Sequence, residues 1–229
     1  MRCGAQAVID DLFAGLDGDD GRRETLAEGA MILRGFVRAR AQSLLAAVGE
    51  IAATAPFRHM LTPGGLRMSV AMSNCGGLGW VSDPRGYRYS PVDPENGRQW
   101  PAMPDSFVDL ARSAAAEAGF ADFTPDACLL NRYAAGSRLS LHQDRDEIDR
   151  GAPIVSVSLG LPAVFLFGGL KRSDSPARIL LVHGDVVVWG GPSRLRYHGV
   201  QPIKAGRCPE TGDCRINLTL RKAGPPGSA

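Results

Sequence analysis

Hydrophobic and polar residues alternate in short runs along the C-terminal half of the chain. After Pro125 these runs are separated by glycine, proline and other turn residues. The predicted strands are 127–133, 137–144, 153–159, 164–167, 179–182, 186–189, 196–200 and 214–221. About eight short strands at this spacing are typical of a sandwich or barrel of the jelly-roll type.

Two segments before residue 120 show helical spacing instead. Apolar residues recur at helical intervals across 38–54, which predicts a first helix. A second helix is predicted over 104–119, with Asp105 or Ser106 as its cap and Gly119 as its stop. The pattern therefore predicts a mainly β fold with flanking helices, an α+β arrangement.

A long irregular segment separates the two predicted helices. Residues 61–104 carry many Gly and Pro residues together with aromatic residues, which predicts hairpins and loops. Such a segment inside a compact domain is usually functional. Residues 1–30 are polar and acidic, so we expect them to be poorly ordered. The length of 229 residues suits one domain over 1–229.

The composition excludes several classes of protein. The content of 44% hydrophobic and 22% charged residues is ordinary for a globular protein. Five cysteines without a C-x-x-C pair argue against a disulfide framework or a Cys-rich zinc site. Acidic residues follow the N-terminus closely and no apolar run is long enough to cross a bilayer, so we expect a cytoplasmic protein.

The basic residues are mostly arginine. The net charge is only +2, but the cations are 23 Arg against three Lys. Arginine binds phosphate bidentately, which would suit a DNA or RNA partner. A biased codon usage in an Ala-, Gly- and Arg-rich proteome explains the same excess and stays open.

Two H-x-D pairs offer metal ligands. His142 and Asp144 lie two residues apart in a predicted strand, so both side chains would share one face. With a distant histidine, His198, they would form the 2-His-1-carboxylate set of a non-haem iron site. The other pair, His183 and Asp185, flanks a glycine between two apolar strands, which predicts a tight turn instead. We therefore take the first pair and His198 as the ligands of a redox enzyme.

The last predicted strand carries a polar face. Arg215, Asn217 and Arg221 alternate with apolar residues that face the hydrophobic layer. Two buried guanidinium groups need anions, and a dicarboxylate would satisfy both. A solvent-facing polar side is the alternative, but the iron triad favours the first interpretation. Asn131 and Tyr133 form a similar face, and iron with a bound dicarboxylate is the layout of 2-oxoglutarate-dependent oxygenases.

Longer strings of sequence carry a specific family likeness. The strings that carry it lie at 131–147, 153–162, 183–191 and 214–221, with shorter ones at 62–65, 68–72 and 79–80. Through them the chain, from about residue 30 to 224, is similar to bacterial AlkB. This is the family of alkylated-DNA repair dioxygenases. The resemblance implies a double-stranded β-helix core at about 120–223. It also implies a nucleotide-recognition lid at about 55–104. Residues 1–30 look unlike the family, and their composition predicts a flexible segment.

The resemblance also implies the cofactors. It implies Fe(II), 2-oxoglutarate as cosubstrate, and O2. The iron ligands would be His142, Asp144 and His198. The residues that hold 2-oxoglutarate would be Asn131, Tyr133, Arg215, Asn217 and Arg221.

The substrate residues rest on the same resemblance. Trp80 would stack on a flipped base opposite His198, and Tyr87 would contact the nucleic-acid backbone. Asp146 would face the exocyclic amine of the methylated base, and Arg172 would line the pocket. Extrusion costs little for a base that cannot pair, and an aromatic platform then stabilises it.

The implied activity is oxidative removal of N-alkyl groups, as on 1-methyladenine and 3-methylcytosine, from single- or double-stranded DNA or from RNA. 2-Oxoglutarate would become succinate and CO2, and the alkyl group would leave as an aldehyde. We expect a monomer without a membrane partner. The same chemistry on tRNA, a protein or a small molecule is one alternative, and a non-catalytic jelly-roll binding module is another.

Overall fold

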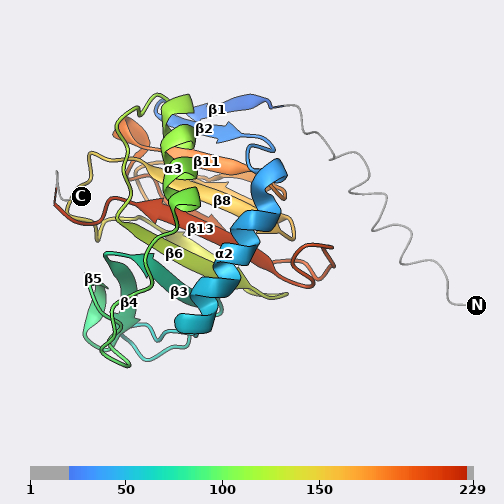
Figure 1. The fold of residues 1–229 in the computed structure, drawn as a ribbon. Coiled ribbons are helices and arrows are strands. Elements are labelled where there is room, and N and C mark those ends of the chain that lie inside the picture. Colours follow the sequence, from blue (N-terminus) through green and yellow to red (C-terminus); the bar gives the residue numbers. More distant parts are fainter. Residues whose placement is uncertain (1–20, 226–229) are drawn as a thin grey trace, which may run out of the picture.

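A seven-stranded antiparallel sheet forms the centre of the molecule. The computed structural model describes residues 21–225. The strands lie in the order β1-β2-β11-β8-β13-β6-β3 (Figure 1). Their bounds are β1 Arg23–Ala27, β2 Ala30–Leu33, β3 Ala71–Gly76, β6 Ala127–Tyr133, β8 Ile154–Gly160, β11 Val186–Trp189 and β13 Arg215–Arg221.

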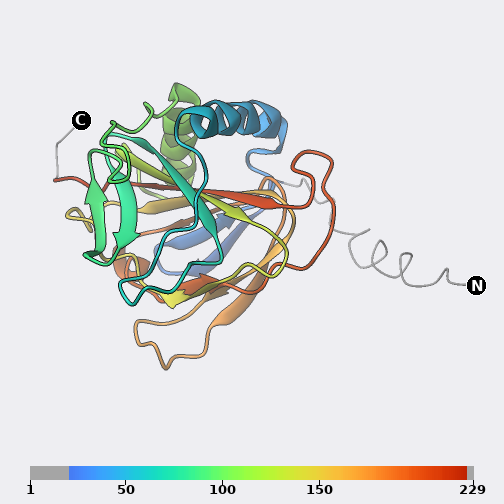
Figure 2. The same cartoon turned by 90° about the horizontal axis from the view of Figure 1, so that it is seen from below.

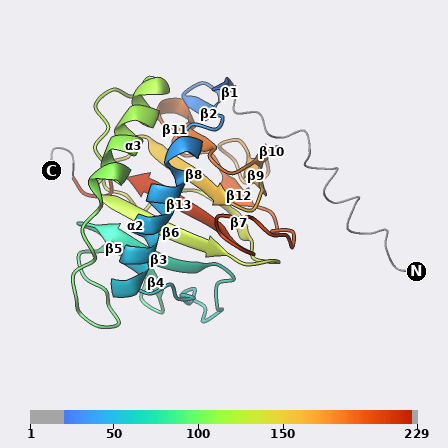
Figure 3. The same ribbon diagram turned by 45° about the vertical axis from the view of Figure 1, so that its right-hand side comes forward.

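A four-stranded sheet faces the first, in the order β10-β9-β12-β7 (Figure 3). Its strands are β7 Leu139–His142, β9 Ala163–Phe167, β10 Ala177–Leu181 and β12 His198–Val200, and the short 3-10 turn η2 Gly191–Ser193 precedes β12. Figure 2 shows this sheet and the helices on opposite sides of the large sheet. Two facing antiparallel sheets confirm the predicted jelly roll.

Two helices cover the outer face of the large sheet (Figure 1). The 3-10 turn η1 Arg38–Arg40 leads into α2 Ala41–Thr54, and α3 is Asp105–Glu117. Ile216, Leu218 and Leu220 of β13 belong to the core that these helices share with the sheet. Because side chains alternate along a strand, the polar residues of β13 face the other sheet. The fold therefore places that polar stripe between the two sheets.

The second helix differs at its start from the sequence prediction. Neither Asp105 nor Ser106 caps it: Pro104 holds the cap position, and no side-chain cap bond is made there. Asp105 opens the helix, where a carboxylate suits the helix dipole. Gly119, with φ of +89°, ends the segment as predicted. Neither helix, nor any other within 21–225, is long and apolar enough to span a membrane.

The irregular segment contains a hairpin of β4 Gly79–Asp83 and β5 Gly86–Ser90 beside β3. Gly79 is needed there, because a Cβ atom at this position would lie 2.4 Å from the Trp100 ring. Trp100 packs with Val81 and Ala55 in a small buried cluster. The predicted hairpins and loops are confirmed here, and the hairpin rests on a tryptophan anchor.

Three strands were not predicted. The sequence suggested a poorly ordered segment to about residue 30, but β1 and β2 begin at Arg23 and extend the large sheet. The prediction for residues 1–20 lies outside the described residues. β3, inside the segment expected to be loops, is buried at nearly every position. A strand buried on both faces shows no alternation, so the period-two pattern could not mark it.

Candidate metal and cosubstrate site

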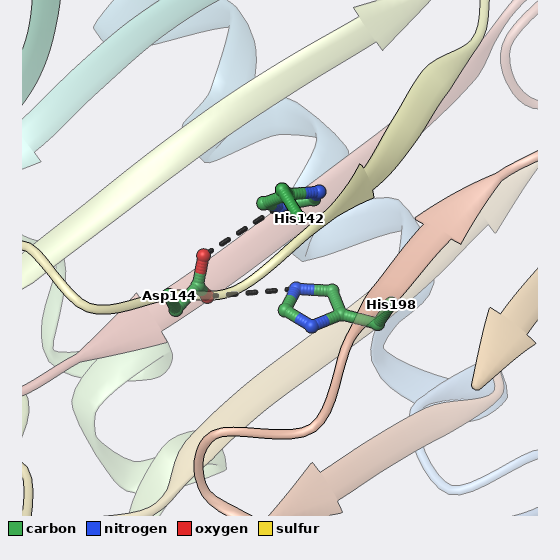
Figure 4. Close-up of side chains that lie close together, drawn as sticks. All are labelled: His142, Asp144 and His198. Carbon is green, nitrogen blue, oxygen red and sulfur yellow. Dashed lines mark ion pairs between the residues drawn. The ribbon is translucent and has the colours of Figure 1, made fainter. Parts of the chain in front are cut away.

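The first H-x-D pair and His198 meet at the ends of two neighbouring strands (Figure 4). His142 ends β7, and His198 begins β12 directly opposite it. Asp144 Oδ1 lies 3.6 Å from His142 Nε2, and Asp144 Oδ2 lies 3.8 Å from His198 Nε2. The three ligand atoms lie within 4.8 Å of one another. Since β7 stops at His142, the period-two argument does not extend to Asp144, which is held by its contacts.

The two histidines present the same nitrogen to this site. His142 Nδ1 lies 2.9 Å from the carbonyl of Ser140, and His198 Nδ1 lies 3.0 Å from the carbonyl of Arg196. A carbonyl only accepts, so each Nδ1 carries the proton and each Nε2 keeps a free lone pair. This arrangement is typical of imidazoles that bind a metal.

The protonation states also suit a divalent cation. Burial, with the neighbouring His142 ring, lowers the pKa of His198 to about 4, although Asp144 opposes this. Burial alone would raise the pKa of Asp144, but Arg221 and the two imidazoles outweigh it and hold that pKa well below its usual range. At neutral pH the site therefore holds a neutral His198 imidazole and a carboxylate.

A second cluster, of His183, Cys208 and Glu210, also brings possible ligand atoms within 4.8 Å. There the backbone N–H of Gly160 donates to His183 Nδ1 at 3.0 Å. In a neutral ring the proton is then on Nε2, so the nitrogen that a metal would need is occupied. The rejected partner, Asp185, follows a turn at a glycine with φ of +93°, as predicted.

All predicted site residues line one cavity of about 690 Å³ between the sheets and the hairpin. They are Trp80, Tyr87, Asn131, Tyr133, His142, Asp144, Asp146, Arg172, His198, Arg215, Asn217 and Arg221. Its walls join the metal triad to the polar stripe on β13. The structure therefore brings together every residue that the sequence assigned to the site.

Arg215 lies at the deep end of this cavity. It is 2% exposed, and it donates to Ser158 Oγ at 3.0 Å. Its Cζ atom is 5.1 Å from the centre of the Tyr133 ring. Its Nε and Nη1 atoms are buried with no hydrogen-bond partner within the described chain. Burial lowers the pKa of this guanidinium. Unsatisfied buried donors beside a phenol fit an anionic ligand.

Arg221, at the other end of β13, has its anions within the protein. It donates to Asp144 Oδ2 from Nε at 2.9 Å and from Nη2 at 2.7 Å. Its Nε atom also lies 3.4 Å from Glu147 Oε1. Burial would lower the pKa of Arg221, but Asp144, Tyr89 and Glu147 together outweigh this and raise it. The expectation that both arginines need an added anion is therefore met only at Arg215.

The amides between these arginines form a connected polar stripe. Asn217 Nδ2 donates to Ser156 Oγ at 2.9 Å and to the carbonyl of Val157 at 2.8 Å. Asn131 Nδ2 and Thr219 Oγ1 both donate to Asn217 Oδ1, at 3.2 and 2.9 Å. These bonds fix the floor of the cavity between its two ends.

The hairpin closes the open side of the cavity. The Trp80 and Tyr87 rings are stacked, with centres 5.6 Å apart and planes 13° apart. Trp80 Nε1 donates to Asp146 Oδ2 at 2.9 Å. Arg172, across the cavity, donates to the carbonyl of Leu141 at 2.7 Å. A carboxylate and two aromatic rings therefore line the same cavity as the metal triad.

Sequence reasoning missed three residues behind the triad: Tyr89, Glu147 and Arg194. Glu147 is 4% exposed and Arg194 is 3% exposed. Arg194 donates to Glu147 Oε2 at 3.0 Å, and Tyr89 donates to Glu147 Oε1 at 2.8 Å. No local pattern marks them, because each lies in or beside irregular structure and finds its partner from a distant segment.

Comparisons with known proteins identify the family of this chain. The family model of the 2OG-Fe(II) oxygenase superfamily matches residues 29–221. The chain is 62% identical to alpha-ketoglutarate-dependent dioxygenase AlkB of Escherichia coli K12 over 202 residues, 88% of this chain and 94% of that protein. It is 36% identical to human nucleic acid dioxygenase ALKBH1 over 127 residues, 55% of this chain and 32% of that protein.

The fold is shared as well. The solved structure of OsALKBH1 superposes with a TM-score of 0.78 at 29% identity, over 88% of this chain and all of that chain. The triad and the unsatisfied Arg215 fit the two groups on which such enzymes depend, Fe(II) and 2-oxoglutarate. The chain therefore belongs to the AlkB family within the 2OG-Fe(II) oxygenase superfamily and is an Fe(II)- and 2-oxoglutarate-dependent dioxygenase that uses O2.

Proposed function

We propose that this enzyme repairs nucleic acid by oxidising N-alkyl groups on bases of the 1-methyladenine and 3-methylcytosine type. The observation that carries the proposal is the shared cavity, which Trp80 and Asp146 line together with the metal triad. A stacking ring and a carboxylate are what a flat cationic base needs. The name of the human relative, nucleic acid dioxygenase ALKBH1, supports the same substrate class.

We assign metal binding and cosubstrate binding to residues at the two ends of the cavity. Fe(II) and 2-oxoglutarate supply the oxidation, as 2-oxoglutarate becomes succinate and CO2 and the alkyl group leaves as an aldehyde. His142, Asp144 and His198 would hold the metal. Arg215, with Tyr133, would bind one carboxylate of 2-oxoglutarate, because its donors are otherwise unsatisfied.

Arg221 would contact the 2-oxoglutarate carboxylate that lies nearer the metal. It lies against Asp144 and therefore beside the position of the cation. Asn131 and Asn217 would complete the floor between the two arginines. Each carboxylate of the cosubstrate would then face one arginine, but only Arg215 would bind it through donors that have no partner within the described residues.

The base would lie between Trp80 and His142. The sequence expectation placed His198 opposite Trp80, but only 6% of the His198 side chain is exposed, against 35% for His142. The Trp189, Phe165 and His142 rings surround His198. Accessibility therefore favours His142 as the opposing ring.

The remaining contacts recognise charge and the nucleic-acid backbone. Asp146 would face the exocyclic amine and favour a base that carries a positive charge. Tyr87, 48% exposed, would contact the backbone, and Arg172 would line the pocket rim. Single-stranded DNA, double-stranded DNA and RNA all remain candidate partners. Cytoplasmic location and a monomeric state remain predictions.

Mass spectrometry of methylated oligonucleotides tests the proposal. A 1-methyladenine oligonucleotide incubated with enzyme, Fe(II), 2-oxoglutarate and air should lose one methylene unit per lesion and yield an equivalent of succinate. Asp144→Ala provides the control without turnover. Succinate formation stimulated by a methylated protein or small molecule, but by no oligonucleotide, would refute the proposed substrate. No succinate under any condition would favour a non-catalytic binding module.

A further inference from the structure

Four charged side chains form a buried group behind the metal triad. Asp144, Glu147, Arg194 and Arg221 are 8%, 4%, 3% and 6% exposed. Desolvating four charges is costly, and apolar residues of similar volume often stabilise a protein as well as a buried ion pair does. Glu147 and Arg194 are also not among the residues that line the cavity. Stability alone therefore gives a weak reason for their presence.

The contacts of this group converge on one metal ligand. Arg221 donates to the Asp144 carboxylate at 2.7 Å, and Arg194 donates to the Asp144 backbone carbonyl at 2.7 Å. Glu147 joins the two arginines, since its Oε2 accepts from Arg194 and its Oε1 lies 3.4 Å from Arg221 Nε. Asp144 lies beyond the end of β7. These contacts hold a ligand that no strand holds.

The hairpin enters the same group through Tyr89 on β5. The Tyr89 hydroxyl donates to Glu147 Oε1 at 2.8 Å, the same oxygen that faces Arg221. Burial is the main cause that raises the pKa of Tyr89 well above its usual value, so the phenol keeps the proton that it donates. Trp80 lies directly opposite Tyr89 in the β4–β5 pairing and bonds to Asp146. One cross-strand pair thus holds two consecutive carboxylates.

We propose that Tyr89 and Glu147 are positioning residues that couple the hairpin to the metal and cosubstrate site through Arg221 and Asp144. Tyr89 and Arg221 share one oxygen of Glu147, so a movement of the hairpin changes how strongly Glu147 holds Arg221. Arg221 in turn shares its donors between Glu147 and Asp144. Occupation of the metal site and closure of the hairpin then stabilise each other, because coupling of this kind is reciprocal.

Hydrogen exchange tests the coupling without nucleic acid. Backbone amides of residues 79–90 are followed in the full-length protein, with and without saturating Mn(II) and 2-oxoglutarate. The wild-type hairpin should exchange more slowly when both are bound. Tyr89→Phe, which removes only the hydroxyl, should lose that slowing while both ligands still bind. Equal slowing in wild type and Tyr89→Phe, or none in wild type, overturns the proposal.

Two further variants separate coupling from loss of structure. Ser90→Ala removes a hydroxyl from the same strand, whose bond goes to the Val92 carbonyl at 2.6 Å, and should keep the wild-type slowing. Glu147→Gln keeps an acceptor for Tyr89 but removes the charge that faces the arginines, and should lose it. Slowing retained in Glu147→Gln, or lost equally in Ser90→Ala, contradicts the assignment.

Oligonucleotide affinity gives the size of the coupling and rests on the proposed function. The Kd of a 1-methyladenine oligonucleotide is measured with and without Mn(II) and 2-oxoglutarate. Coupling between two sites typically changes an affinity by about 5- to 150-fold. The ratio of the two Kd values should fall toward one in Tyr89→Phe. An unchanged ratio in this variant overturns the inference. A wild-type protein that does not bind the oligonucleotide refutes the proposed function, while the exchange experiment still decides the inference.

Discussion

Residues 142–144 and 183–185 are both H-x-D motifs, and the fold uses them in opposite ways. Each aspartate is buried and bonds to an arginine at 2.7 Å, Asp144 to Arg221 and Asp185 to Arg34. Only the first motif opens into the cavity and meets a second histidine across a strand pair. Residue types, spacing and even the arginine partner are therefore insufficient to identify a metal site.

The backbone group that faces each imidazole makes the difference. At His142 a carbonyl faces Nδ1, so Nε2 is free for a cation. At His183 an amide N–H faces Nδ1, so Nε2 carries the ring proton. Asp185 meanwhile accepts hydrogen bonds from the backbone N–H groups of Gly35 and Val182 and closes a turn. The first motif serves chemistry, and the second serves architecture.

The largest expected effect comes from the first aspartate. Asp144→Ala should reduce turnover below detection and weaken metal binding, because it removes one of three ligands. Its melting temperature should also fall, because the buried Arg221 loses its closest anion and retains the longer contact with Glu147 at 3.4 Å. Succinate formation, metal titration and thermal unfolding measure the three effects. Full activity in this variant would exclude the triad.

Replacing the second aspartate should lower stability without affecting metal binding. Asp185→Ala leaves Arg34 without one buried partner, and such a loss costs on the order of 3–5 kcal/mol of unfolding free energy. The lower part of that range is expected, because Arg34 also pairs with Glu24. Denaturant unfolding measures the loss, and metal stoichiometry should remain that of wild type. A reduced stoichiometry in a folded Asp185→Ala protein would end the distinction between the motifs.

The arginines sharpen the comparison within the first site. Arg215→Ala should raise the 2-oxoglutarate requirement by the ~1.5–3 kcal/mol of a charge-assisted bond, about 10- to 150-fold, with metal affinity retained. Arg221→Ala should weaken both 2-oxoglutarate and metal binding, because Asp144 loses its partner. Titrations of each variant with Mn(II) and with 2-oxoglutarate measure the two affinities separately. Wild-type dependence on 2-oxoglutarate in either variant would remove that arginine from the site.

The smallest effect is expected from Trp80, which lines the cavity of the first motif. The second motif does not line this cavity. Trp80→Ala should weaken binding of a methylated oligonucleotide by the ~1–3 kcal/mol that base stacking supplies. Affinity for 2-oxoglutarate without nucleic acid should keep its wild-type value. Fluorescence anisotropy and 2-oxoglutarate titration give the two numbers. Unaltered oligonucleotide affinity with a lower melting temperature would make Trp80 a packing residue.

Much of the site was predictable because it lies on regular strands. The alternation along 214–221 placed Arg215, Asn217 and Arg221 on one face, and the structure has them there between the sheets. The strand bounds of β6 and β11 also agree with the predicted runs. By contrast, β3 was missed because burial on both faces removes the alternation.

The sequence by itself determined which faces of the strands are polar and which residue types could bind a cation and a dicarboxylate, because alternation is a local property of an extended backbone. Only the tertiary structure decided which H-x-D motif binds, which arginine already has an anion, and which residues hold Asp144. Those outcomes depend on carbonyls, carboxylates and phenols from distant segments. Glu147, for example, meets Tyr89 from the hairpin and Arg194 from the turn before β12. Their positions follow from how the sheets pack, which no local pattern of residues contains.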